Sequence, residues 1–197
     1  MARAFRRRGR GASVRYVADL DAGEREIVAD LMRQVAALLD PQAPEPTGDE
    51  PFDAIVAGMA LRPEPDGADH PRRDPALDRL LPSGHREDDE VASEFRRLTE
   101  GGLRNRKAQA LVAAAAALSE QDAVSLDPAG AGRFLAALTD VRLVLGQRLG
   151  LERDEDLDAL EAAAERADED DPLAMLLGLY DFLTWLQETL ASALLGD

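Results

Sequence analysis

The sequence predicts a mainly α-helical protein, a single-domain helical bundle of about four to five helices with a small N-terminal β-hairpin. Three observations support this fold class. Apolar residues recur every three or four positions over most of the chain, which is typical of amphipathic helices. Strand-forming residues flank a glycine-rich turn near the start. The chain has 197 residues, which suffices for one domain with a core that needs no disulfide or metal.

Residues 2–20 are predicted to form the hairpin. Phe5, Val14 and Tyr16 are strand formers, and Gly9-Arg10-Gly11 supplies a turn that permits positive φ. Because an isolated hairpin is marginally stable, we expect it to lie against the helical body. Its arginines then have two interpretations. They are exposed strand positions that face an acidic helix surface, or they contact nucleic acid or an acidic protein partner.

The first helix is predicted over residues 21–40. Asp21 is the expected N-cap, and Glu24 stands three residues later, as in a capping box. Apolar residues at helical spacing predict one buried stripe, formed by Ile27, Leu31, Val35 and Leu38. Residues 41–87 hold most of the prolines and both histidines, so we interpret them as an irregular connector. Within it, Pro51–Ala60 is apolar enough for a short helix.

Residues 88–197 are predicted to form the main helical bundle, and residues 1–197 together one domain. A long helix should run from Asp88 to Ser119, with a buried stripe at Leu111, Ala114 and Leu118. The pair Gly101-Gly102 in its middle predicts a kink or a close helix contact.

Two further helices are predicted in this bundle. One has Asp127 as its N-cap and Pro128 in its first turn, and it ends near Leu149 with Gly150 after it. The last helix starts at Pro172 and is apolar on most of its circumference. Such a helix is central to a core or to an interface, so a homodimer is one expectation.

The charge of the chain is unevenly distributed. With 23 Lys+Arg against 39 Asp+Glu, the formal net charge is −16. Six arginines precede the first acidic residue, Asp19, and from there on 17 basic residues face 39 acidic ones, a balance of −22. This acidic body argues against broad duplex DNA binding. No apolar stretch follows the first arginines as in a secretory signal, and none is long enough to span a membrane, so we expect a cytoplasmic protein.

Several classes of active site are excluded or disfavoured. The chain has no cysteine and two histidines, which rules out thiol chemistry, disulfides, cysteine-bound metals and multi-histidine sites. No serine lies in a nucleophile elbow, and no phosphate-binding glycine motif is present. We therefore expect no enzyme activity, no catalytic residue, no cofactor and no metal. Acidic residues Asp154 to Glu165 follow EF-hand spacing, but Ala159 replaces the required glycine, so a solvated acidic helix or loop is the simpler interpretation.

Two charged segments, 94–107 and 140–142, stand out within apolar helices. They fit intramolecular ion pairs between helices, or a face that binds a partner. Together with the arginine-rich arm and two aromatic residues of the last helix, they give the candidate partner-binding or ion-pair residues: Arg6, Arg7, Arg8, Glu94, Arg96, Arg97, Arg104, Lys107, Asp140, Arg142, Tyr180 and Trp185.

Five segments in order carry a family resemblance: Asp74-Pro75-Ala76-Leu77, Leu80-Leu81-Pro82, Glu94-Phe95-Arg96-Arg97-Leu98-Thr99-Glu100, residues 140–150 and residues 180–188. Through these segments, which span nearly the whole chain, the sequence resembles an actinobacterial family catalogued as a domain of unknown function. This family includes the actinomycete oxidative-stress regulator AosR. The resemblance implies a non-enzymatic regulator of transcription that binds a stress sigma factor or RNA polymerase. It also implies a redox-sensing cysteine pair in the best-known members, and this cysteine-free chain lacks that switch.

The sequence thus predicts a regulatory adaptor without a disulfide switch, whose partner is a sigma factor or RNA polymerase. Two alternatives stay open. The arginine-rich arm would make the chain a nucleic-acid-binding protein, or the chain would be a protein-interaction scaffold unrelated to transcription. Binding of a metal or small molecule is a further hypothesis.

Overall fold

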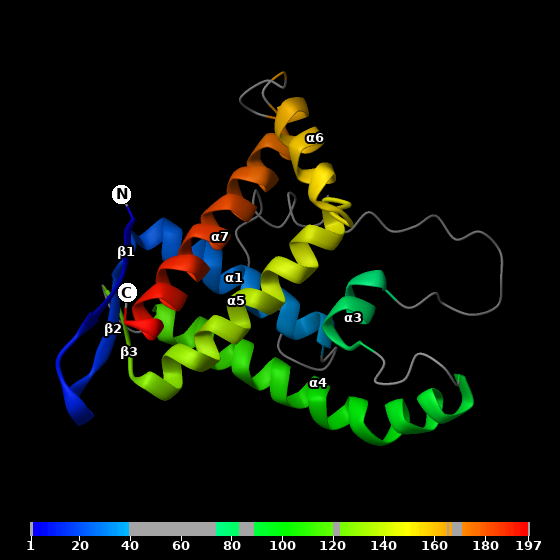
Figure 1. Ribbon diagram of the computed structural model, residues 1–197, viewed down its shortest axis with the longest axis horizontal. Helices are drawn as coiled ribbons and strands as arrows, with labels where there is room; N and C mark the ends of the chain where they lie inside the picture. Colours follow the sequence, from blue (N-terminus) through cyan, green and yellow to red (C-terminus); the bar gives the residue numbers. More distant parts are fainter. Residues whose placement is uncertain are drawn as a thin grey trace.

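The computed structural model describes residues 2–39, 74–82, 89–119, 123–164, 166 and 171–196; of residues 89–99 and Asp154 it describes the backbone alone. Most of the predicted connector, including the expected short helix Pro51–Ala60 and both histidines, lies outside these residues. The described ranges are mainly helical with a small antiparallel sheet, which confirms the predicted fold class (Figure 1). Their helices are α1 (Ala22–Leu39), α3 (Pro75–Leu80), α4 (Asp89–Ser119), α5 (Pro128–Arg148), α6 (Asp154–Ala164) and α7 (Pro172–Leu195).

The predicted hairpin forms, and a third strand extends it. Strands β1 (Arg3–Arg8) and β2 (Arg15–Asp19) pair antiparallel around a short 3-10 turn, Gly11–Ser13. Strand β3 (Val124–Leu126) pairs with the other edge of β2, so the sheet order is β1-β2-β3. Strand β3 was not predicted, because three residues are too few for strand periodicity to show.

The turn of the hairpin depends on its two glycines. Gly9 has a φ of 81° and Gly11 a φ of 56°, both in the left-handed region. A Cβ atom at Gly9 would overlap the Ser13 carbonyl oxygen, whereas one at Gly11 would meet nothing within 4 Å. The turn therefore tolerates a side chain at Gly11 far better than at Gly9.

Gly9→Ala is expected to lower the free energy of unfolding by about 2 kcal/mol or more, because a left-handed penalty of roughly 1–2 kcal/mol adds to the overlap with Ser13. Gly11→Ala carries the left-handed penalty alone, about 1 kcal/mol. Urea unfolding of the two variants measures the difference. Equal losses in both variants would contradict this turn geometry.

The sheet is held against the bundle by its first strand. Phe5 is buried, and its ring meets Phe134 of α5 edge-on at 6.0 Å between centroids. The Phe5 backbone amide donates a hydrogen bond to Thr189 Oγ1 of α7 at 3.4 Å. The first strand thus lies beside the C-terminal half of the last helix, at one edge of the molecule (Figure 1).

Helix α1 begins with the predicted capping box. The Glu24 amide donates to Asp21 Oδ1 at 2.9 Å, and the Asp21 amide donates to Glu24 Oε2 at 2.8 Å. The predicted apolar stripe is only partly right, because Leu31 and Val35 are buried but Ile27 is 37% exposed. The observed buried face is rotated slightly around the helix axis relative to the predicted stripe, because α1 packs on α4 and α5 from that side. It consists of Val28, Ala29, Leu31, Met32, Val35, Ala36 and Leu39.

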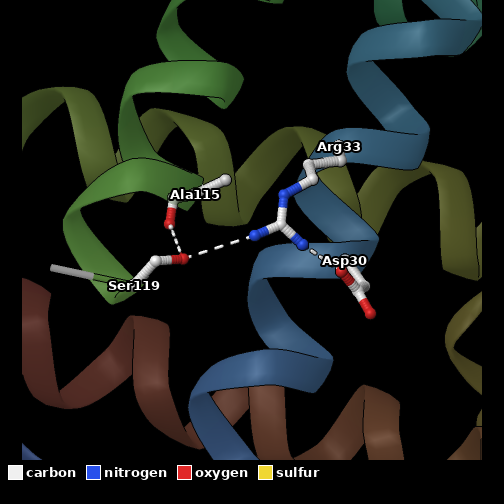
Figure 2. Close-up of polar contacts among 4 residues, drawn as sticks. All are labelled: Asp30, Arg33, Ala115 and Ser119. Carbon is white, nitrogen blue, oxygen red and sulfur yellow. Dashed lines mark hydrogen bonds and ion pairs between the residues drawn. The ribbon is translucent and has the colours of Figure 1, made fainter. Parts of the chain in front are cut away.

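A polar contact joins α1 to the end of α4. Figure 2 shows the guanidinium of Arg33 between Asp30 of its own helix and Ser119, the last residue of α4. Arg33 donates to Ser119 Oγ at 3.3 Å, and this hydroxyl donates in turn to the Ala115 carbonyl at 3.2 Å. The contact lies at the rim of the apolar α1–α4 interface.

Helix α4 buries the predicted stripe of Leu111, Ala114 and Leu118. The expected close helix contact at Gly101-Gly102 is wrong, because both glycines are exposed and a Cβ at Gly101 would meet nothing within 4 Å. The helix continues through them without interruption. The two glycines therefore do not serve helix packing within the described part of the chain.

Helix α3 lies inside the segment that the sequence analysis interpreted as an irregular connector. Its N-cap is Asp74, whose Oδ1 accepts from the Ala76 amide at 2.9 Å, and Pro75 fills its first position. Buried Ala76 and Leu80 face α5. The many prolines around α3 led to the prediction of an irregular segment. Asp74-Pro75 is nevertheless a typical helix start.

The signals at the ends of α5 were predicted correctly. Asp127 Oδ1 accepts from the Gly130 amide at 2.5 Å, and Gly150 follows the helix with a φ of 75°. The Leu151 amide donates to the Gly146 carbonyl at 2.8 Å, which closes the helix end in a Schellman arrangement. Helix α5 crosses the centre of the fold and contacts α1, α3, α4 and α7.

The last two helices form a projecting pair. Helix α6 contacts the N-terminal part of α7, and the two stand at the top of the view in Figure 1. The C-terminal half of α7 is central to the core, with Leu183, Leu186 and Leu190 fully buried. Near its start, Met175 is 49% exposed. The apolar circumference of α7 therefore belongs to the core in one half and is partly open to solvent in the other.

Candidate interaction surface

Arginines gather on the outward side of the sheet, which we call the basic sheet face and define as Arg3, Arg6, Arg8 and Arg15. Cross-strand partners share a face of a sheet. Arg8 pairs with Arg15 and Arg6 with Val17, while Phe5 and Tyr16 point to the core. A register shift between Arg3 and Arg6 brings Arg3 beside Asp19 on the same outward side. Four cationic side chains thus share one side of two short strands.

Asp19 is the only acidic residue in the three strands. Its Oδ2 accepts from the Arg6 guanidinium at 2.8 Å, and this bond, with the nearby charges of Arg3 and Arg8, lowers the pKa of Asp19. One of the two interpretations of the sequence has these arginines facing an acidic helix surface. Among the described residues, Arg6 alone of the hairpin arginines has a carboxylate within 4 Å, and that carboxylate lies in the neighbouring strand.

Apart from Arg6, the arginines of the hairpin are exposed. Arg7 stands opposite Tyr16 and is exposed, and Arg10 lies in the turn. Arg15 donates to the Val14 carbonyl at 2.9 Å, which leaves most of its donors to solvent. The hairpin therefore presents a cationic surface whose charge is only partly neutralised within the described chain.

Lys107 and Asp140 form an ion pair between α4 and α5. Lys107 Nζ lies 2.5 Å from Asp140 Oδ1, and the two side chains are 25% and 7% exposed. Burial raises the pKa of Asp140, and Lys107 opposes this shift through its hydrogen bond and its charge. Lys107 is the only lysine of the chain. The pair connects α4 to α5, with the Asp140 side chain buried and that of Lys107 partly exposed.

Arg142 joins α5 to α7 through uncharged partners in the described part of the chain. Its guanidinium donates to Gln187 Oε1 at 3.0 Å and to the Tyr180 hydroxyl at 3.2 Å. The guanidinium carbon also lies 5.1 Å from the centre of the Tyr180 ring, within cation–π range. Tyr180 therefore holds Arg142 in place both through its hydroxyl and through its ring.

The remaining candidates lie apart from these. Arg104 pairs with Glu100 of its own helix at 3.1 Å, and Trp185 stacks on Phe182 with ring centroids 5.8 Å apart. The side chains of Glu94, Arg96 and Arg97 lie outside the described part of the chain. Those of the predicted residues whose side chains the structure describes do not gather at one place. They divide into the basic sheet face and contacts between or within helices.

Three of the segments that carry the family resemblance meet at α5. Arg148 binds Asp74 with both guanidinium nitrogens, at 3.1 and 2.5 Å, and Arg79 donates to Gln147 at 3.0 Å. The segments 74–77 and 180–188 thus contact opposite ends of segment 140–150. These contacts join α3 and α7 to α5.

Sequence reasoning missed several of these contacts. Asp19 was not recognised as the partner of Arg6, nor Gln187 as that of Arg142, although alternation along β2 places Asp19 on the arginine side. Asp74 and Arg148 were noticed only as motif residues. Their separation of 74 positions leaves no local signal for a bidentate ion pair.

No group of three or more metal-binding side chains occurs among the described residues. In the segment with EF-hand spacing, Asp156 Oδ2 accepts from the Glu152 and Arg153 amides at 2.9 and 2.7 Å. These two bonds lower the pKa of Asp156. Asp156 therefore caps the start of α6. Of the described helices, none combines the length and apolar character that crossing a bilayer requires.

Helix α6 and the residues just before it present an acidic face, which we define as Glu152, Glu155, Asp158 and Glu161. All four side chains are exposed, they recur every third residue, and none has an ion pair among the described residues. Leu157 and Leu160 are partly buried on the side towards α7. The projecting α6–α7 pair therefore displays unneutralised negative charge at the end of the molecule opposite the sheet (Figure 1).

Two comparisons with known proteins point to the same family. A family model described as a domain of unknown function (DUF2017) matches residues 2–194. Over 161 residues the chain is 32% identical to the proposed oxidative stress regulator AosR of Mycobacterium leprae (strain TN), covering 75% of the chain and 66% of that relative. The chain thus spans about two thirds of the length of this curated relative. No solved structure matches significantly.

Proposed function

The chain belongs to the DUF2017 family of domains of unknown function, and from this premise we propose that it is a non-enzymatic regulatory adaptor in the response to oxidative stress. Its partner is a stress sigma factor or RNA polymerase. The observation that carries this proposal is the similarity to AosR over three quarters of the chain. The adaptor works without a disulfide switch, because the chain has no cysteine.

The acidic face of α6 is the part of the surface best suited to such a partner. Sigma factors and polymerase bind nucleic acid, so they carry basic regions that the body of this chain complements in charge. Glu155, Asp158 and Glu161 are exposed and unpaired within the described residues, so binding breaks no internal ion pair. Carboxylates at the rim of an interface also keep part of their hydration, so binding costs little desolvation free energy.

Affinity purification from the native cell, with and without oxidative stress, tests the proposal. We expect the full chain to recover a sigma factor or polymerase subunits identified by mass spectrometry. The charge-reversal variant Glu155→Lys/Asp158→Lys/Glu161→Lys should recover at least about tenfold less, because it replaces attraction by repulsion.

A matched control changes the same number of charges elsewhere. Glu26→Lys/Asp181→Lys/Glu188→Lys alters three exposed carboxylates on α1 and α7 and should keep recovery within about twofold. Recovery of neither polymerase nor any sigma factor counts against the proposed function. Equal loss in both variants would show that net charge, and not the acidic face, governs binding.

A further inference from the structure

We propose that the basic sheet face binds the phosphate backbone of duplex nucleic acid, without sequence specificity. The juxtaposition that supports this is four outward arginines on two paired strands, beside a single carboxylate. The contact is separate from the protein contact proposed for α6. It needs no other protein, so the purified chain tests it independently.

The spacing of these arginines fits phosphates. Arg6 and Arg8 are two positions apart on one strand and share its outward side, which places their Cα atoms about 7 Å apart. This is close to the distance between adjacent phosphates of one nucleic-acid strand. Guanidinium groups match phosphate oxygens with paired donors, so each arginine can hold a phosphate by two hydrogen bonds.

The pairing of Arg8 with Arg15 also points to an external anion. Like charges directly opposite each other on one face of a sheet repel and destabilise it. Neither side chain has a carboxylate within 4 Å among the described residues. A phosphate between the two guanidinium groups would convert this repulsion into two attractive contacts.

The composition of the face favours a duplex backbone over single strands. Proteins that bind single strands stack bases on exposed aromatic rings. Both aromatic residues of the hairpin, Phe5 and Tyr16, are buried on the opposite side of the sheet. The remaining outward residues of the strands, such as Val17 and Ser125, offer no stacking platform. A duplex, whose phosphates lie on its outside, needs none.

The acidic body limits where a duplex can contact the chain. From Asp19 onward the charge balance is −22, and this acidic body repels phosphates from the helices. The turn of the hairpin stands at one edge of the molecule, and α6 projects at the far end (Figure 1). Binding is therefore confined to the hairpin, weak and strongly dependent on salt.

Fluorescence anisotropy of a labelled duplex of about 20 base pairs measures this binding in about 20 mM salt. The dissociation constant should rise with salt on logarithmic axes with a slope of about 3 to 4, as expected for four phosphate contacts. Arg8→Ser/Arg15→Ser should weaken binding at least about tenfold. Asp19→Asn should strengthen it about threefold, because Arg6 then has no competing carboxylate.

The matched control is Arg133→Ser/Arg153→Ser, which removes two exposed arginines from outside the hairpin and should weaken binding less than about twofold. The melting temperature of Arg8→Ser/Arg15→Ser should equal or exceed that of the unchanged protein, which separates loss of binding from loss of fold. Absence of duplex binding overturns the proposal. So does equal weakening in both double variants, or binding of polyglutamate in place of the duplex, which would assign the face to acidic proteins.

Discussion

Replacing Lys107 with methionine is expected to lower the free energy of unfolding by about 3–5 kcal/mol at neutral pH. The variant keeps the volume of the side chain but leaves the carboxylate of Asp140, which is 7% exposed, without its cation. A buried charge without a partner is much more costly than the ion pair itself is stabilising. Urea unfolding at pH 7 measures the loss.

The pH dependence identifies Asp140 as the cause. Burial raises the pKa of Asp140 in the folded protein above its unfolded value, so ionisation of this group opposes folding. Its unfavourable contribution is absent below the unfolded pKa and grows as pH rises through the folded pKa. Loss of Lys107 raises the folded pKa further. The difference between the variant and the unchanged protein should therefore shrink as the pH falls from neutral towards about 4.

The double variant Lys107→Met/Asp140→Leu is the control, because it removes both charges and keeps apolar volume. It should be markedly more stable than Lys107→Met alone, and its own stability should lack the pH dependence that Asp140 causes. A double variant that is as unstable as the single one would show that Lys107 contributes through packing and not through charge.

Phe134→Ala is the second variant with a large expected effect, a loss of about 3–5 kcal/mol. Phe134 is 1% exposed and meets the ring of Phe5 edge-on, so its removal opens a cavity between α5 and the sheet. The loss combines the transfer free energy of the ring with the cost of that cavity. Thermal and urea unfolding both measure it.

Two comparisons isolate the contact. Leu143→Ala changes a residue of the same helix that is 37% exposed, and it should cost less than about 1 kcal/mol. In a double-mutant cycle, Phe5 and Phe134 should couple by about 0.5–1.5 kcal/mol. Additive losses would show that the sheet does not rest on α5 through these two rings.

Local chemistry explains which parts of the fold could be predicted. Asp21 with Glu24, Asp127 with Pro128, and Gly150 each act within a few residues, and the structure confirms all of these helix ends. The buried face of α1 was predicted less well. Two adjacent faces of α1 both carry apolar residues at helical spacing, so periodicity alone does not choose between them. The position of α4 decides that Val28 is buried while Ile27 is exposed.

The features that sequence reasoning missed depend on distant residues. Strand β3 exists because β2 offers it an edge, and α3 packs on α5 with help from the pair of Asp74 and Arg148. Strand β2 is far from β3 in the sequence, and Arg148 is far from Asp74. The same holds for the candidate residues: the repeated arginines marked the hairpin, but only the register showed that Arg8 faces Arg15 and that Asp19 belongs to the same face.

The contact between β1 and α7 can form only late in the synthesis of the chain. Phe5 and Thr189 are 184 positions apart, so a ribosome adding roughly 5–20 residues per second needs roughly 10–40 s to make the second after the first. Throughout that interval the nascent hairpin lacks the helix against which it is finally buried. Its arginines then protect it, because charged strands resist pairing with other chains and aggregating.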